Sequence, residues 1–156
     1  FQQYGILPDV CSFAKGIAGG LPMSGILANE KCRQVLTPGT HATTFGGNPV
    51  CAAAALAVLD TLDTAALNQV TDKGFYLREQ IAALGSPYVR DVRGMGLMVG
   101  VGIQGMTHAE AAAKLREAGL LCLTAGSDTL RLLPPLTITK AELDEGLAIM
   151  KKVLCD

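Results

Sequence analysis

Residues 8–23 read PDVCSFAKGIAGGLPM and place one lysine, Lys15, between a short apolar run and a glycine-rich turn. The apolar residues 10–14 predict a buried strand that is bounded by Pro8 and Gly16. Lys15 then stands at the carboxyl end of this strand, where open α/β sheets bind their ligands. A lone lysine is more often a solvated side chain. The residues around Lys15 favour a chemical role, so it is the candidate catalytic residue.

A second candidate site lies in residues 40–49, which read THATTFGGNP. The segment has no periodicity and ends at Asn48 and Pro49, an N-cap followed by proline at the first helical position. The loop should therefore bring Thr43 and Thr44 close to a helix N-terminus, where hydroxyls, N–H groups and the helix dipole favour a phosphate dianion. The alternative is that both hydroxyls only bond the loop backbone.

Three motifs follow one another along the chain: FAKG with AGGLPM in residues 13–23, GTHATTFGGNP in residues 39–49, and GLLCLTAG with LRLLPPLTIT in residues 119–139. Together they resemble the class III aminotransferases, which depend on pyridoxal 5'-phosphate (PLP). Within that class, residues 119–139 are most similar to the acetylornithine aminotransferases. The resemblance covers nearly the whole chain but only part of the length of a complete family member.

The resemblance implies a role for each candidate residue. Lys15 would bind PLP covalently as a Schiff base and move protons during the reaction. Thr44 would hold the PLP phosphate and Thr43 would touch substrate, both in the active site of the partner subunit of a homodimer. The implied reaction moves an amino group from N-acetylornithine to 2-oxoglutarate in arginine biosynthesis. Ornithine, succinylornithine and γ-aminobutyrate remain open as alternative donors.

Arg131 has two interpretations that the residues leave open. It falls on a predicted strand just before Pro134 and Pro135. The planar guanidinium suits a substrate carboxylate, and it suits a structural carboxylate equally well. The resemblance places this arginine at the mouth of the substrate site. His41, in the threonine loop, is interpreted as a loop hydrogen-bonding residue rather than as an acid or base.

The pattern of elements predicts an α/β protein: the end of a large PLP-binding domain of transferase fold type I (residues 1–63), a connecting helix (64–85) and a small α+β domain (86–156). Two capping boxes, at Thr107 and Thr139, predict helix starts in the small domain. The predicted strands are 10–14, 23–28, 89–92, 97–103, 120–124 and 129–133, with a turn at residues 93–94, and the predicted helices are 29–36, 49–62, 64–84, 107–119 and one from 139 to the C-terminal end.

Composition argues against several classes of function. A net charge of −1 leaves no electrostatic footprint for nucleic acid, and no apolar run approaches the roughly 18 residues of a membrane span. The five cysteines are odd in number and lack ligand spacing with the two histidines, so we expect reduced thiols in a cytoplasm and no metal site. Only 17% of residues are charged while 49% are hydrophobic, which predicts burial against another protein or against a missing half of this one.

Two further interpretations compete with the enzyme. Residues 100–105, GVGIQG, match a dinucleotide-binding pattern with Asp128 downstream, but the next helix begins at its own cap, Thr107, past the last glycine. The chain could instead be a non-catalytic structural fragment. It begins with Phe1 rather than methionine, and the resemblance puts the phosphate-binding turn, the ring-stacking aromatic and the pyridine-nitrogen acid upstream. We therefore expect a fragment that is inactive by itself.

Overall fold

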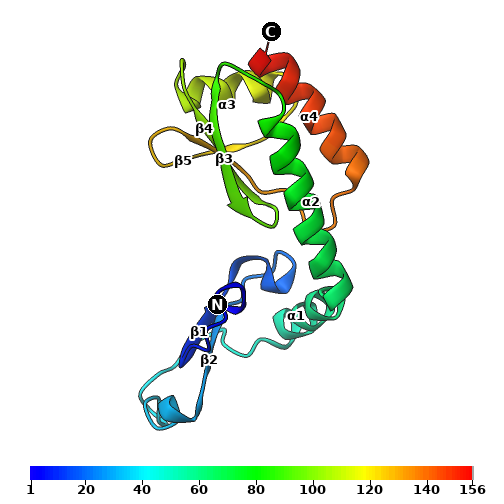
Figure 1. Ribbon diagram of the computed structural model, residues 1–156. Helices are drawn as coiled ribbons and strands as arrows, with labels where there is room; N and C mark the ends of the chain where they lie inside the picture. Colours follow the sequence, from blue (N-terminus) through cyan, green and yellow to red (C-terminus); the bar gives the residue numbers. More distant parts are fainter. Residues whose placement is uncertain (156) are drawn as a thin grey trace. The chain divides into compact units, whose positions relative to one another are not determined.

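The structure of the chain is a computed structural model that describes residues 1–155. These residues form two compact units, one from Phe1 to Asp63 and one that begins at Thr64 (Figure 1). The predicted division into domains 1–63, 64–85 and 86–156 stays a prediction.

The first unit contains a two-stranded antiparallel sheet, in which β1 (Val10–Phe13) pairs with β2 (Gly25–Ala28). Both predicted strands are present but shorter than expected. The predicted burial of the first strand is wrong for residues 1–155, because β1 has only β2 beside it and its side chains alternate between exposed and half-buried. The unit also contains three short 3-10 helices: η1 (Gln2–Tyr4), η2 (Lys15–Ala18) and η3 (Glu30–Cys32).

Helix α1 (Pro49–Thr61) begins as predicted, because the Asn48 side chain accepts the N–H groups of Val50 and Cys51. The helix contacts η2 and buries Cys51 and Ala55. The predicted apolar face at Ala52, Leu56 and Leu59 is not the one buried here, since Leu56 and Leu59 are exposed. The predicted helix 29–36 is reduced to η3. Asn29 caps it, but no apolar face holds further turns.

The second unit is a four-stranded antiparallel sheet with strand order β3-β4-β6-β5, covered on one face by three helices (Figure 1). Both capping boxes form, with Thr107 and Glu110 and with Thr139 and Glu142 bonded to each other's backbone N–H groups. The elements are α2 (Thr64–Ala82), β3 (Val89–Met95), β4 (Met98–Ile103), α3 (His108–Glu117), β5 (Leu123–Ala125), β6 (Thr129–Leu132) and α4 (Lys140–Cys155).

The core of the second unit lies between the sheet and these helices. It contains the residues that the apolar periodicity of the last helix predicted, Leu143, Leu147, Met150 and Leu154. The other buried members come from α2, α3, β4 and β6: Leu77, Ile81, Ala111, Leu115, Val99, Val101, Ile103, Leu130 and Leu132. Helix α2 therefore belongs to the core of the second unit, which begins at its first residue.

The hairpin between β3 and β4 turns later than predicted. Residues 93–94 were expected in the turn, but β3 continues to Met95 and the turn lies at Gly96, which has a φ of 51°. This turn packs on α2, where Gly74 meets the Gly96 carbonyl and Arg78 Nη1 donates to the same oxygen at 3.1 Å. A Cβ on Gly74 would lie 1.9 Å from that oxygen.

We predict opposite effects for two helical Gly→Ala substitutions. Alanine normally stabilises a helix by about 1 kcal/mol relative to glycine. Gly74→Ala should instead destabilise the unit by about 1–3 kcal/mol, because a backbone carbonyl occupies the space of the new methyl group. Gly146→Ala in α4 is the matched control, since its Cβ would meet only Leu120 Cδ1 at 3.5 Å. Urea unfolding midpoints measure both variants, and a shift in the same direction would contradict this explanation.

Candidate active site

Lys15 follows β1 after one residue, Ala14, and begins η2. Its φ is 62°, and among residues 1–155 it is the only residue other than glycine with a positive φ. Ala14 before it is extended, so the backbone changes from an extended to a left-handed conformation at Lys15. Such a conformation is costly for a residue with a Cβ and occurs often at functional sites. The exposed Lys15 side chain makes no hydrogen bond or ion pair with the described residues.

The threonine loop departs from the expected phosphate site in one respect. The Asn48 side chain takes the N–H groups of Val50 at 3.0 Å and Cys51 at 3.2 Å. These N–H groups of α1 are therefore not available to a phosphate, and the predicted contribution of the helix N-terminus is not supported there. The hydroxyls of Thr43 and Thr44 remain available, because neither forms a hydrogen bond within residues 1–155.

The alternative role expected for Thr43 and Thr44, a hydrogen bond to the loop backbone, is performed by Thr40 instead. Thr40 Oγ1 donates to the Thr37 carbonyl at 2.6 Å. His41 was expected to form hydrogen bonds in this loop, and its side chain forms none with the part of the chain that the structure describes. The loop is stabilised through Thr40, which leaves His41, Thr43 and Thr44 with exposed polar groups.

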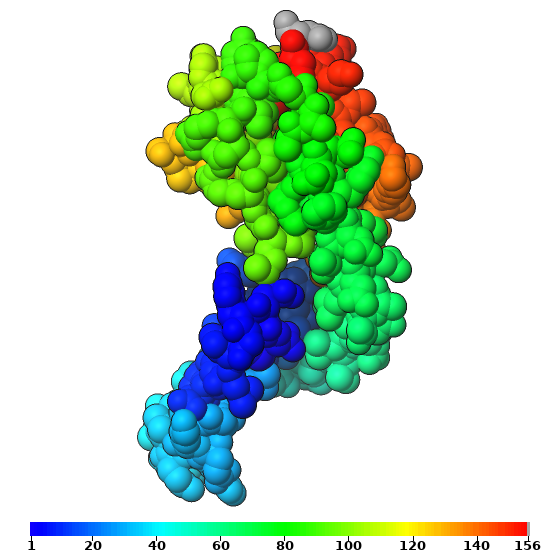
Figure 2. All heavy atoms as spheres, viewed as in Figure 1, coloured from blue at the N-terminus to red at the C-terminus, as the bar shows by residue number. Residues whose placement is uncertain are grey.

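A pocket of about 740 Å³ in the first unit joins the lysine strand to the threonine loop. Ala14 and Thr43 both line it, each a direct neighbour of one candidate cofactor residue. Lys15 and Thr44 themselves are not among its lining residues. The other lining residues include His41 and Asn48, which the sequence analysis named, and Ser12 and Ser24, which it did not. Figure 2 shows this unit, blue to cyan, with all its atoms.

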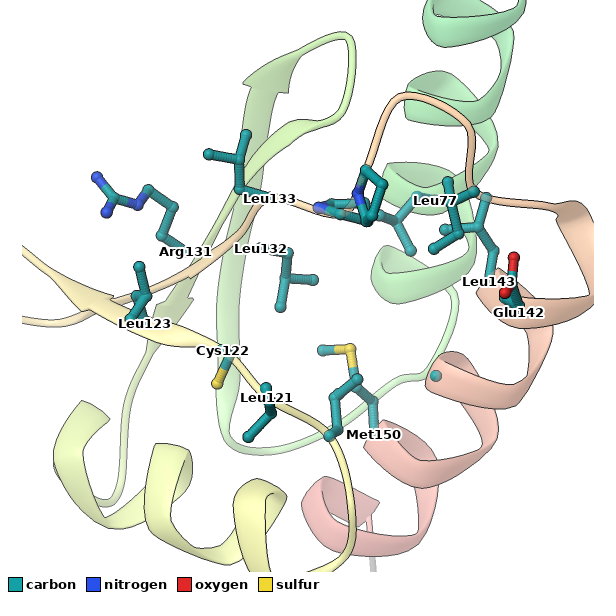
Figure 3. Close-up of a pocket in the computed structure, with 15 residues that line it drawn as sticks. Leu77, Leu121, Cys122, Leu123, Arg131, Leu132, Leu133, Glu142, Leu143 and Met150 are labelled. Carbon is teal, nitrogen blue, oxygen red and sulfur yellow. The ribbon is translucent and has the colours of Figure 1, made fainter. Parts of the chain in front are cut away.

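Arg131 belongs to the second unit, on the sheet face opposite the helices. In register it lies beside Gly100 on one side and Leu123 on the other. No carboxylate among the described residues pairs with it, so a structural role as an ion-pair partner finds no support there. Arg131 is one of the residues that line an apolar pocket of about 360 Å³, which the sequence did not predict. Figure 3 shows its side chain extending away from Leu132 and Met150, which line the same pocket.

The neighbouring charged residues of the same sheet are paired. Arg90 donates to Asp91 at 2.8 Å and to Asp128 at 2.7 Å, and the Arg90 hydrogen bond lowers the pKa of Asp128. Arg93 bonds Asp91 and reaches Thr129 Oγ1 at 2.6 Å. Arg131 therefore differs from these arginines in having no partner within residues 1–155.

The dinucleotide interpretation does not agree with this geometry. Gly100 and Gly102 lie inside β4, which pairs antiparallel with β3 and β6, so they do not form a turn between a strand and a helix. A Cβ on Gly102 would lie 2.3 Å from Asp91 Oδ2, so this glycine makes room for the ion pairs above the sheet. Asp128, the expected ribose ligand, is bonded to Arg90.

The remaining expectations concern cysteines, metals and membranes. All five cysteines are free thiols, and burial raises the pKa of Cys122. No group of His, Cys, Asp and Glu residues within 1–155 could hold a metal ion. No single helix of these residues is long and apolar enough to cross a membrane, although α1 and α2 taken together have a sufficient length and composition.

The backbone of Lys15 leads to a prediction about stability. In a full-length protein that contains this chain, Lys15→Gly should be more stable than Lys15→Ala by about 1 kcal/mol, because glycine adopts a positive φ without a Cβ penalty. At the extended Ala14, the matched change Ala14→Gly should be destabilising. Thermal unfolding of the cofactor-free proteins measures this, and a more stable Lys15→Ala would show that the backbone is not strained.

Known proteins resemble this chain along nearly its whole length. The family described as "Aminotransferase class-III" matches residues 1–154. The acetylornithine aminotransferase of Mycobacterium tuberculosis is 46% identical over 154 residues, which are 98% of this chain and 38% of that protein. That of Bacillus subtilis is 40% identical over 156 residues, 99% of this chain and 40% of that protein.

Two solved structures are also similar. The ornithine delta-aminotransferase of Plasmodium falciparum has a TM-score of 0.89 at 34% identity, covering 98% of this chain and 41% of its own. The acetylornithine aminotransferase of Elizabethkingia anophelis has a TM-score of 0.89 at 32% identity, covering 98% and 42%. These structures confirm the predicted fold class, transferase fold type I. The chain spans about two fifths of the length of the relatives it matches. It belongs to the class III aminotransferase family.

Proposed function

We propose that the full-length protein containing this chain is a PLP-dependent aminotransferase that moves an amino group from N-acetylornithine to 2-oxoglutarate in arginine biosynthesis. The observation that carries the proposal is Lys15, whose unpaired amine follows a strand end in a chain of this family. Relatives named acetylornithine aminotransferase, 40–46% identical along nearly the whole chain, support the choice of donor. The isolated chain is proposed to be inactive, and the enzyme to be cytoplasmic.

The described residues fit the cofactor. A free lysine amine can bind the aldehyde of PLP, and the free hydroxyl of Thr44 can donate to its phosphate. When bound, PLP supplies an electron-accepting ring that stabilises negative charge on the substrate carbon. Lys15 Nζ would take a proton from the substrate carbon as a base and would later give that proton up as an acid. This role requires that the Lys15 amine is not paired with a carboxylate, and Lys15 has no ion-pair partner within residues 1–155.

Two further residues would orient the substrate. We propose that the hydroxyl of Thr43 contacts the amino donor and that Arg131 binds a substrate carboxylate through its planar guanidinium. Arg131 suits this role because it is exposed, whereas the nearby Arg90 and Arg93 are bonded to Asp91. Thr43 and Thr44 are proposed to act in the partner subunit's site, within a homodimer that shares its active sites.

Ornithine is the second candidate donor. The structural likeness to the Plasmodium falciparum ornithine delta-aminotransferase, with a TM-score of 0.89, favours ornithine over succinylornithine and γ-aminobutyrate. N-acetylornithine and ornithine differ in the acetyl group on the α-amine, and this changes the charge at that nitrogen. The ratio of kcat/KM for these two donors, measured on the full-length enzyme, distinguishes them.

Reduction with borohydride should identify the lysine. We expect peptide mapping of the reduced full-length enzyme to find the pyridoxyl mass on Lys15. Lys31→Arg is the matched control and should retain labelling, because the Lys31 amine already pairs with Asp9 at 3.1 Å. Lys15→Arg should lose it. A pyridoxyl group on Lys31 or Lys73 would refute the assignment.

Subunit mixing should test the shared site. If Thr44 serves the partner subunit's cofactor, full-length Lys15→Ala and Thr44→Ala variants should complement each other. One site of the heterodimer then contains an intact Lys15 from one subunit and an intact Thr44 from the other. Activity should rise above that of either parent after exchange, with differently tagged subunits proving that heterodimers form. Heterodimers without recovered activity would mean that Thr44 acts within its own chain or away from PLP.

A further inference from the structure

The side chain of Thr43 lies over the backbone of Gly46. A Cβ built on Gly46 would be 2.2 Å from Thr43 Cγ2 and 3.5 Å from Thr43 Cβ. The first distance is far shorter than a van der Waals contact between carbon atoms. The present side-chain conformation of Thr43 therefore requires that residue 46 has no side chain.

The two adjacent glycines of this loop serve different purposes. Gly47 has a φ of 70°, which favours glycine because of the backbone, and a Cβ there would meet nothing within 4 Å. Gly46 does not have a positive φ, so alanine is compatible with its backbone. The constraint at Gly46 comes from the Thr43 methyl group alone.

The collision that a side chain at residue 46 would cause can be relieved by rotation of the Thr43 side chain. Thr43 is β-branched, so its side chain occupies discrete rotamers about the Cα–Cβ bond. The colliding atom is a methyl group on an exposed loop, and turning to another rotamer would remove it from the new Cβ. The same rotation swings the Thr43 hydroxyl by about 120° because the hydroxyl shares that bond. Both residues line the 740 Å³ pocket, so the rotation changes the polar surface of the pocket.

We propose that Gly46 is a positioning residue: because it has no side chain, Thr43 can keep the rotamer that directs its hydroxyl toward a hydrogen-bonding group of the amino donor. The inference rests on the proposed function, in which Thr43 contacts substrate. It predicts that a methyl group on residue 46 weakens donor binding through Thr43, with little effect on folding or on the cofactor. The hydroxyl has no bond within residues 1–155 that would hold it in place instead.

The test uses the full-length enzyme with Gly46→Ala, Thr43→Ser and the double variant. Gly46→Ala should raise KM for the donor about three- to tenfold, the equivalent of one hydrogen bond, with kcat nearly unchanged. Thr43→Ser keeps the hydroxyl and removes the colliding methyl group. The double variant should therefore regain the KM of Thr43→Ser. Gly146→Ala, in the other unit, is the control for an added methyl group and should leave KM unchanged.

Two measurements do not depend on turnover. Titration of cofactor-free protein with PLP should give the same dissociation constant for Gly46→Ala and wild type, and their unfolding temperatures should agree closely. Three-bond couplings to the Thr43 methyl group, measured by NMR, should report a changed rotamer in Gly46→Ala.

Three results would overturn the proposal: a KM unaffected by Gly46→Ala, a raised KM that Thr43→Ser does not rescue, or a loss of PLP affinity that accounts for the whole effect. If the wild-type enzyme transaminates no donor, the proposed function fails by itself. The NMR couplings then decide separately whether Gly46 sets the Thr43 rotamer.

Discussion

Burial of apolar side chains between the sheet and helices α2, α3 and α4 is the interaction on which the second unit depends. Strands β4 and β6 place Val99, Val101 and Leu130 against helical leucines with almost no exposed surface. The first unit has no comparable layer, since its buried apolar residues are only Ala18, Cys51 and Ala55. Large side chains such as Leu7 and Phe45 are 89% and 81% exposed there. The candidate cofactor residues thus belong to the unit with the smaller core, and Arg131 to the unit with the larger one.

This contrast explains which parts of the fold were predictable. Helix starts depend on a few neighbouring residues, so Asn48 with Pro49 and the boxes at Thr107 and Thr139 were predicted correctly. Strand ends depend on a partner strand that is distant in sequence. For that reason β3 continued through the predicted turn at residues 93–94 and β5 began later than expected. The buried face of α1 also depends on its neighbours in space, and its own periodicity indicated Leu56 and Leu59 rather than Cys51 and Ala55.

The candidate site was predictable in its residue types but not in its conformations. A lysine between a strand and a glycine turn indicated Lys15, yet no local signal gives a lysine a φ of 62°. The asparagine that predicted the start of α1 also removed two N–H groups from the expected phosphate site. When the Asn48 side chain caps the helix, it accepts the N–H groups of Val50 and Cys51, and these groups are then no longer free for a phosphate. The choice became visible only from the hydrogen-bond partners of Asn48, and the hydroxyls of Thr43 and Thr44 are then among the donors that the loop still offers.

Glycine shows why a motif alone could not separate the competing functions. Gly47 has a positive φ, whereas Gly46, Gly74 and Gly102 each leave space for a different kind of atom: a methyl group, a carbonyl oxygen and a carboxylate. The pattern GVGIQG resembles a phosphate loop in sequence, but its second glycine accommodates Asp91 on an antiparallel sheet. The consequences of substitution differ accordingly. The Gly96 carbonyl that faces Gly74 cannot move without shifting the β3–β4 hairpin, whereas the Thr43 methyl group that faces Gly46 can rotate away. The first contact therefore bears on stability, and the second bears on where a neighbouring hydroxyl points.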